Sequence, residues 1–163
     1  MTKPNMINKT RLLFVVATVL FFSGCSREER PADMPPLYPF VITLTAEGTP
    51  VESASVSLHS TIPNFKWTIG GITDAKGKAI IATHGRYIGV PEGEYAVTVE
   101  KVESDQYDPE KPPPTVRLYS YTKLEYTDPE KTPLKINVTR KSRAETLDVG
   151  KLEKIVLRVV PTN

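Results

Sequence analysis

The sequence contains few of the residues from which most catalytic and metal centres are built. Its 163 residues include two histidines, one tryptophan and a single cysteine. His59 and His84 have no metal-ligating or catalytic partner at a suitable spacing, so we interpret both as solvated surface side chains unless they meet across a sheet to hold zinc. The sequence also has no Gly-x-Ser-x-Gly elbow and no phosphate-cradling glycine motif. These absences predict a protein that is not an enzyme and that holds no cofactor or metal.

Long apolar runs are missing as well. The apolar segment at residues 12–22, interrupted once by a threonine, is shorter than the roughly 20 residues that span a bilayer. It follows a basic segment without acidic residues, and two small residues separate it from Cys25. A cationic start, a short apolar core and small residues before a cleavage site are typical of a secretory signal peptide. The sequence therefore predicts export, with residues 1–24 as the cleaved signal.

The cysteine stands where such a signal would be cut. Residues 22–25 (FSGC) resemble the lipobox of bacterial lipoproteins, although leucine is commoner there than Phe22. The resemblance implies a diacylglyceryl group on Cys25, and two acyl chains hold a protein stably where one holds it marginally. We therefore expect the membrane as a partner of this chain, in a bacterial cell envelope. Ser26, where an aspartate would favour the inner membrane, favours the outer membrane, on its periplasmic or surface face. The alternative is a free structural cysteine beside an ordinary signal.

Removal of the signal leaves 139 residues with 18 basic and 19 acidic side chains, a net charge of −1. This near-neutral balance gives no reason to expect nucleic acid as a partner. Residues 25–36 carry the cysteine and a charged, proline-rich stretch without periodicity, which predicts a flexible tether. Residues 37–163 are long enough for one domain with a hydrophobic core.

That domain shows the period-two alternation of apolar and polar residues that is typical of β-strands. We expect about seven strands, around residues 38–45, 54–58, 65–69, 78–83, 95–99, 134–138 and 155–159. Turn residues separate them every 8–12 positions, which favours an antiparallel sandwich or barrel. No window shows a helical stripe, and 14 prolines after the signal argue against long helices. Trp67 is predicted to lie in the core or at its rim.

Three of these segments carry a family resemblance. Residues 48–58 (GTPVESASVSL), 71–78 (GITDAKGK) and 89–99 (GVPEGEYAVTV) resemble the carboxypeptidase regulatory-like domain. Residues 126–138 (YTDPEKTPLKINV) look like the closing segment of small bacterial lipoproteins with this domain. The resemblance implies an all-β, seven-strand antiparallel Greek-key sandwich of the transthyretin-like (prealbumin-like) type. It also implies a stable non-catalytic module that serves as a structural or protein-interaction part of the envelope.

The tyrosines leave a second interpretation open. Tyr107, Tyr119, Tyr121 and Tyr126 lie within residues 103–130, where tyrosine and proline could form a surface for a glycan or a protein partner. The favoured interpretation is that Tyr119 and Tyr121 share one side of an edge strand at residues 115–123 and pack on the sandwich. A carbohydrate-binding module is therefore the first alternative, and an accessory hydrolase that combines this loop with a histidine is the less favoured one.

Overall fold

The computed structural model describes residues 30–105 and 115–161. The chain divides into two units, Met1–Met34 and Pro35–Asn163, and every described strand belongs to the second unit. The predicted signal peptide, Cys25 and Tyr107 lie outside the described residues. No helix within the described ranges is long and apolar enough to cross a membrane.

The largest of the three sheets has six antiparallel strands in the order β11-β8-β3-β4-β6-β7. Its strands are β3 (Ser55–Ser60), β4 (Ile69–Ile72), β6 (Ala82–Thr83), β7 (Tyr87–Ile88), β8 (Gly93–Glu100) and β11 (Lys135–Val138). The central strand β8 has the β-branched and aromatic composition that suits a half-buried pleated surface. Tyr95, Val97 and Val99 belong to the core cluster, as their period-two spacing predicts, while Ala96 and Thr98 on the opposite side are buried as well.

The second sheet contains β1 (Val41–Ala46), β2 (Thr49–Pro50), β5 (Lys78–Ile80) and β12 (Ala144–Asp148). Strand β1 pairs antiparallel with β2 and β5 on one side and parallel with β12 on the other. Strand β5 runs on into β6 after one residue, so the chain passes there from this sheet to the larger one.

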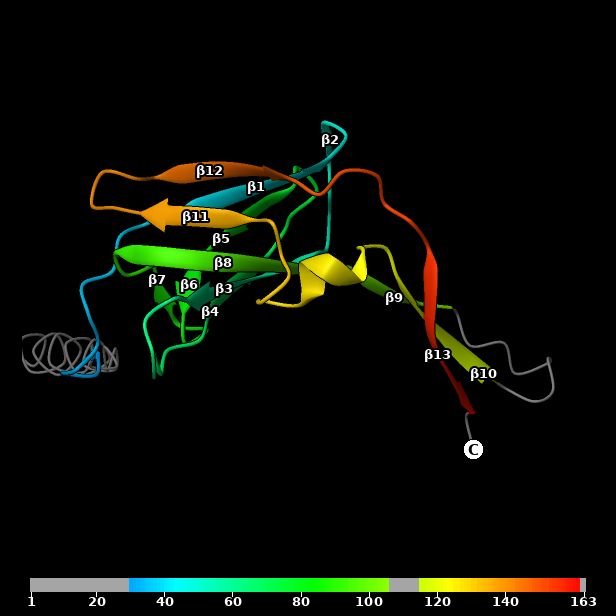
Figure 1. Cartoon of the computed structure of the whole chain (residues 1–163), viewed down its shortest axis with the longest axis horizontal. Coiled ribbons are helices and arrows are strands. Elements are labelled where there is room, and N and C mark those ends of the chain that lie inside the picture. Colours follow the sequence, from blue (N-terminus) through cyan, green and yellow to red (C-terminus); the bar gives the residue numbers. More distant parts are fainter. Residues whose placement is uncertain (1–29, 106–114, 162–163) are drawn as a thin grey trace, which may run out of the picture. The chain divides into compact units, whose positions relative to one another are not determined.

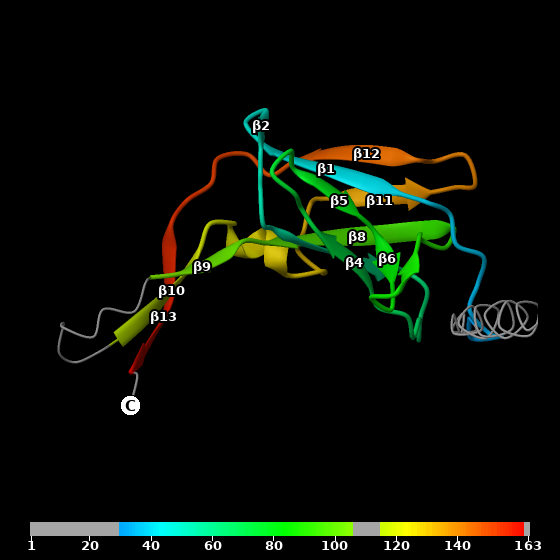
Figure 2. The same ribbon diagram turned by 180° about the vertical axis from the view of Figure 1, so that it is seen from behind.

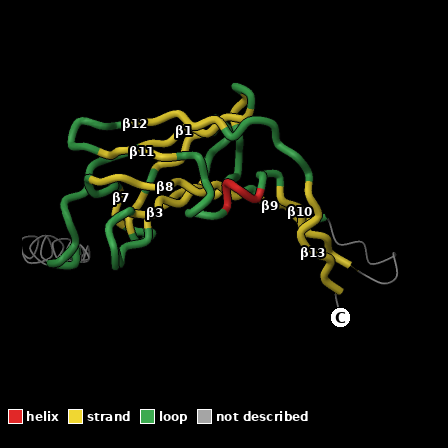
Figure 3. The backbone as a smooth tube through the Cα atoms, viewed as in Figure 1, coloured by secondary structure: helices red, strands yellow, loops and turns green. Residues whose placement is uncertain are grey.

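These two sheets face each other and enclose one core (Figures 1 and 2). The core takes side chains from both layers: Phe40, Ile42, Leu44 and Leu147 on one side, and Val56, Leu58, Val97, Val99, Ile136 and Val138 on the other. The predicted all-β class with antiparallel sheets is therefore confirmed, with the parallel pair β1 and β12 as an exception. Figure 3 shows that strands and loops make up nearly all of the described chain.

The third sheet has three antiparallel strands in the order β13-β10-β9. Its members are β9 (Val102–Ser104), β10 (Thr115–Ser120) and β13 (Ile155–Pro161). The 3₁₀ helix η2 (Leu124–Thr127) follows β10. Among the side chains of these strands that the structure describes (residues 102–104, 116–120 and 155–157), none belongs to the core cluster of the two larger sheets.

Three expected strands differ from the structure. The strand expected at residues 78–83 is divided into β5 and β6, which belong to different sheets. The strand expected at residues 65–69 is wrong in position, because the chain is still a loop there and β4 pairs with β3 only from Ile69 to Ile72. The strand expected at residues 155–159 forms, but as β13 it pairs with β10 instead of closing the sandwich. The closing strand is β12, whose sequence AETLD has one buried side chain, Leu147, and so gives no visible alternation.

Candidate functional site

The predicted tyrosine surface is largely occupied by contacts within the protein. Tyr119 is 9% exposed, and its hydroxyl donates a hydrogen bond to Asp105 Oδ2 at 2.8 Å. The Lys154 ammonium lies 3.7 Å from the centroid of the Tyr119 ring. Tyr126 is partly buried against the core. Tyr119 is therefore buried by contacts within the three-stranded sheet. The expectation that it packs on the sandwich from an edge strand is wrong, because β10 is the central strand of that separate sheet.

Tyr121 is half-buried beside two ammonium groups. Lys101 Nζ lies 5.8 Å and Lys154 Nζ lies 6.0 Å from the centroid of its ring. Lys101 also forms an ion pair with Glu103 at 2.9 Å. The hydrogen bond from Lys101 and a second one from Tyr121 lower the pKa of the Glu103 carboxyl. These side-chain contacts connect β9 with the residue that follows β10. They also leave the ring of Tyr121 less accessible to a ligand.

The two histidines lie in different surroundings. His59 Nε2 is 2.8 Å from Thr98 Oγ1 across the β3–β8 pair, and partial burial lowers the pKa of this imidazole. His84 follows β6 with a positive φ of 55° and packs edge-on against Trp67, with ring centroids 6.0 Å apart. No group of three or more His, Cys, Asp or Glu side chains suited to a metal occurs within residues 30–105 and 115–161.

An open cavity lies at the end of the β3–β4 hairpin. The pairing of β3 with β4 stops at Leu58 and Ile69, while β3 stays paired with β8 as far as Ser60. The chain between them diverges and leaves a pocket of about 460 Å³. Its lining residues include Ser57, His59, Ile62, Asn64, Lys66 and Trp67. We refer to it as the Trp67 pocket. Sequence reasoning missed it because the segment was expected to be a strand.

A second feature that the sequence did not predict is an exposed apolar surface. Ile72, Ile80 and Ile88 are 71%, 63% and 65% exposed. Pairing places Gly70, Ala82 and Ile88 in one row across β4, β6 and β7, with alternate side chains on the outer side. We call the surface formed by Ile72, Ile80, Ala82 and Ile88 the isoleucine face.

The isoleucine face is hollowed by grooves. Ile72 and Ile80 both line two adjoining grooves, of about 510 Å³ and 630 Å³. Gly70 and Gly71 of β4 line the smaller groove, and a Cβ atom added to Gly71 would stand 2.7 Å from the Ile80 carbonyl oxygen. Only glycine allows β4 and β5 to approach so closely at this point.

Charged groups border the larger groove. Lys78 and Arg143 line it together with Asp74. Asp74 Oδ1 accepts hydrogen bonds at 2.8 Å from the backbone N–H groups of Lys76 and Lys78, and these bonds lower the pKa of its carboxyl. The carboxylate accepts hydrogen bonds within its own turn, and the two cationic side chains Lys78 and Arg143 outnumber it along this border.

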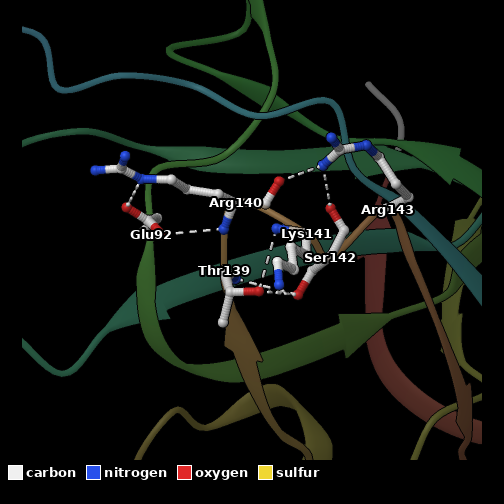
Figure 4. A network of polar contacts seen from close by, with 6 residues as sticks. All are labelled: Glu92, Thr139, Arg140, Lys141, Ser142 and Arg143. Atoms are coloured by element: carbon white, nitrogen blue, oxygen red, sulfur yellow. Dashed lines mark hydrogen bonds and ion pairs between the residues drawn. The ribbon is translucent and has the colours of Figure 1, made fainter.

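The turn that carries Arg143 is held by a polar network (Figure 4). Glu92 accepts two hydrogen bonds from Arg140, at 2.9 Å from its backbone N–H and at 3.1 Å from Nε. Arg143 Nη1 donates to the carbonyl oxygens of Arg140 and Ser142 at 2.7 Å and 2.9 Å. These bonds orient the guanidinium of Arg143 without placing a carboxylate beside it, so its charge is not neutralised by the network in the figure.

Similarity to known proteins adds nothing to this geometry. No family model, no curated protein and no solved structure matches the chain.

Proposed function

We propose that this protein is a lipid-anchored module of a bacterial envelope whose β-sandwich acts by contact with another protein and not by catalysis. The single observation that carries the proposal is the isoleucine face. Soluble domains seldom expose large apolar side chains in contiguous groups, and such groups mark interaction surfaces. Three isoleucines that are each more than three-fifths exposed form such a group here.

The chemistry of the face indicates what it would bind. Its centre is aliphatic, and the border of its larger groove carries Lys78 and Arg143 together with the single carboxylate of Asp74. Burial of aliphatic area supplies affinity, whereas charges at the rim mainly select and orient the partner. We therefore propose a protein partner that presents an aliphatic surface bordered by carboxylates.

The finer fold assignment belongs to the same proposal. A transthyretin-like Greek-key sandwich is supported by the two facing sheets and by the small, fully buried Ala54 that precedes β3. The turn at residues 73–78 supports it too, with Asp74 as its hydrogen-bonding residue and Gly77 at a φ of 73°. Such domains serve mostly as stable modules, which agrees with a role in binding.

A photoreactive amino acid in place of Ile80 tests the interaction in intact cells. We expect one crosslinked protein species from position 80, and weaker crosslinking when Ile72→Ser and Ile88→Ser are added. The matched control is the same photoreactive residue in place of Val156, an apolar side chain of β13 that is 55% exposed. Equal crosslinking from both positions would show that exposure alone produces the products, and it would refute a specific partner at this face.

The anchor has a separate test. Replacement of Cys25 by serine removes the only thiol in the chain. We expect radiolabelled palmitate to enter the unmodified protein and not the Cys25→Ser variant. Label of equal intensity on the variant would refute lipidation at Cys25, and it would leave the interaction experiment unaffected.

A further inference from the structure

The Trp67 pocket has an apolar wall that is held in place from several sides. Phe65 packs edge-on against Tyr95, with ring centroids 6.4 Å apart and planes at 82°. Trp67 packs edge-on against His84 at 85°, and Lys66 Nζ lies 4.9 Å from its ring centroid. Trp67 is nevertheless only half-buried, so part of its indole ring remains accessible to solvent. The pocket therefore presents a large aromatic surface in a fixed position.

Polar groups surround that surface. Ser57 and His59 come from the outer side of β3, and Asn64, Lys66 and Thr68 come from the loop opposite. The side chains of Ser57 and Asn64 make no hydrogen bond to any other described residue of the chain. The pocket lining includes no carboxylate. A ligand in this pocket would thus meet hydroxyl, amide and imidazole groups that donate and accept hydrogen bonds, and one cationic group.

We propose that the Trp67 pocket binds a pyranose ring of a saccharide. A pyranose has an apolar C–H face that packs on an aromatic ring and an equatorial rim of hydroxyl groups that need hydrogen-bond partners. An aromatic wall with a few convergent polar groups satisfies both requirements. The pocket volume of about 460 Å³ lies within the usual range for small-ligand sites. The neutral groups Ser57 and Asn64 suit hydroxyl groups better than they suit a charged peptide.

This site is separate from the tyrosines considered above, but it adjoins the isoleucine face, because Ser57, Thr68 and Ile69 line both the pocket and the smaller groove of that face. Its residues come from β3 and from the loop before β4, whereas Tyr119 and Tyr121 belong to the segment around β10. A saccharide bound in the pocket would therefore lie beside the protein partner proposed above.

Trp67 itself reports on occupancy, because it is the only tryptophan of the sequence. We would titrate the acylated full chain, in a detergent without a sugar headgroup, with maltotriose, cellotriose and tri-N-acetylchitotriose. We expect a saturable change in tryptophan emission with at least one of these three. No saturable change with any of them would overturn the proposal.

Variants at the pocket rim decide whether the saccharide sits in the pocket. We expect the pair Ser57→Ala and Asn64→Gly to weaken binding about tenfold, because each loses a hydrogen bond to the ligand. Glycine is chosen at position 64 because Asn64 has a φ of 60°. The matched control is Ser55→Ala, on the same strand but outside the pocket lining, which should bind like the unmodified protein. Equal binding by all three proteins, or loss of binding in Tyr121→Ala alone, would overturn the assignment to this pocket.

Discussion

The two facing sheets and the three-stranded sheet are built from similar segments but are stabilised differently. In the facing sheets, Ile42, Leu44, Val56, Val97 and Val99 are fully buried and belong to one cluster. In the three-stranded sheet, Val102, Val156 and Leu157 are 39%, 55% and 43% exposed. Both regions have backbone hydrogen bonds between strands, so they differ in how much apolar side-chain surface is buried.

This difference indicates where the free energy of folding is concentrated. Apolar burial contributes roughly 25 cal/mol per Å², whereas a small antiparallel sheet without a core is only marginally stable. The three-stranded sheet has the ring and ammonium contacts of Tyr119, Tyr121, Lys101 and Lys154 in place of a core. We expect the sandwich to unfold as one unit and the three-stranded sheet to open at lower cost.

Removing a core side chain should give the largest effect. Phe40 is 2% exposed within the cluster, so Phe40→Ala leaves a cavity and should lower the free energy of unfolding by about 3–5 kcal/mol. The matched change in β13, Val156→Ala, removes a 55% exposed side chain and should cost less than about 0.5 kcal/mol. Urea denaturation of both variants measures the contrast. Similar shifts in the two midpoints would mean that the sheets share one source of stability.

A smaller effect should be confined to the three-stranded sheet. Tyr119→Phe removes the hydrogen bond to Asp105 Oδ2, worth about 0.5–1.5 kcal/mol, and Lys154→Ala removes a cation–π contact worth about 0.5–1 kcal/mol. We expect amide hydrogen exchange to become faster in β10 and β13 and to stay unchanged in β8. Faster exchange throughout β8 would show that the two regions open together.

The same contrast explains what the sequence could predict. Strand β8 and the turn at residues 73–78 were predictable because their information is local: period two in one case, and Asp74 with Gly77 in the other. Strand β12 was not predictable, because its place is set by parallel pairing with β1, a hundred residues away, and Leu147 is its only buried side chain.

The surfaces were harder to foresee than the strands. Ile72, Ile80 and Ile88 belong to three short strands, and each could equally have pointed into the core. Only the register, which sets Gly70 opposite Ala82 and Ala82 opposite Ile88, shows that they share the outer side. The Trp67 pocket exists because β4 begins four residues later than the start of the strand expected there. Such a shift depends on tertiary pairing that no local pattern contains.

A titration of Asp148 refines the comparison within the sandwich. The carboxylate closes the end of β12 onto the β1–β2 turn, since it accepts hydrogen bonds from Gly48 N at 3.0 Å, Thr45 Oγ1 at 2.8 Å and Gly150 N at 2.7 Å. The bond from Gly48, followed by those from Thr45 and Gly150, lowers the pKa of Asp148 to about 2. In the unfolded chain an aspartate has a pKa of roughly 3.9.

Because the folded pKa lies below the unfolded one, Asp148 contributes stability that is present above about pH 4 and is lost as the pH falls toward 2. We expect Asp148→Asn to weaken this acid dependence, measured as the urea midpoint between about pH 5 and pH 2. Glu145→Gln is the matched control, because Glu145 is an exposed carboxylate of the same strand. It should leave the acid dependence of the unmodified protein intact. If both variants weaken the acid dependence of the urea midpoint equally, the effect arises from net charge. The hydrogen bonds of Asp148 to the β1–β2 turn would then not be its cause.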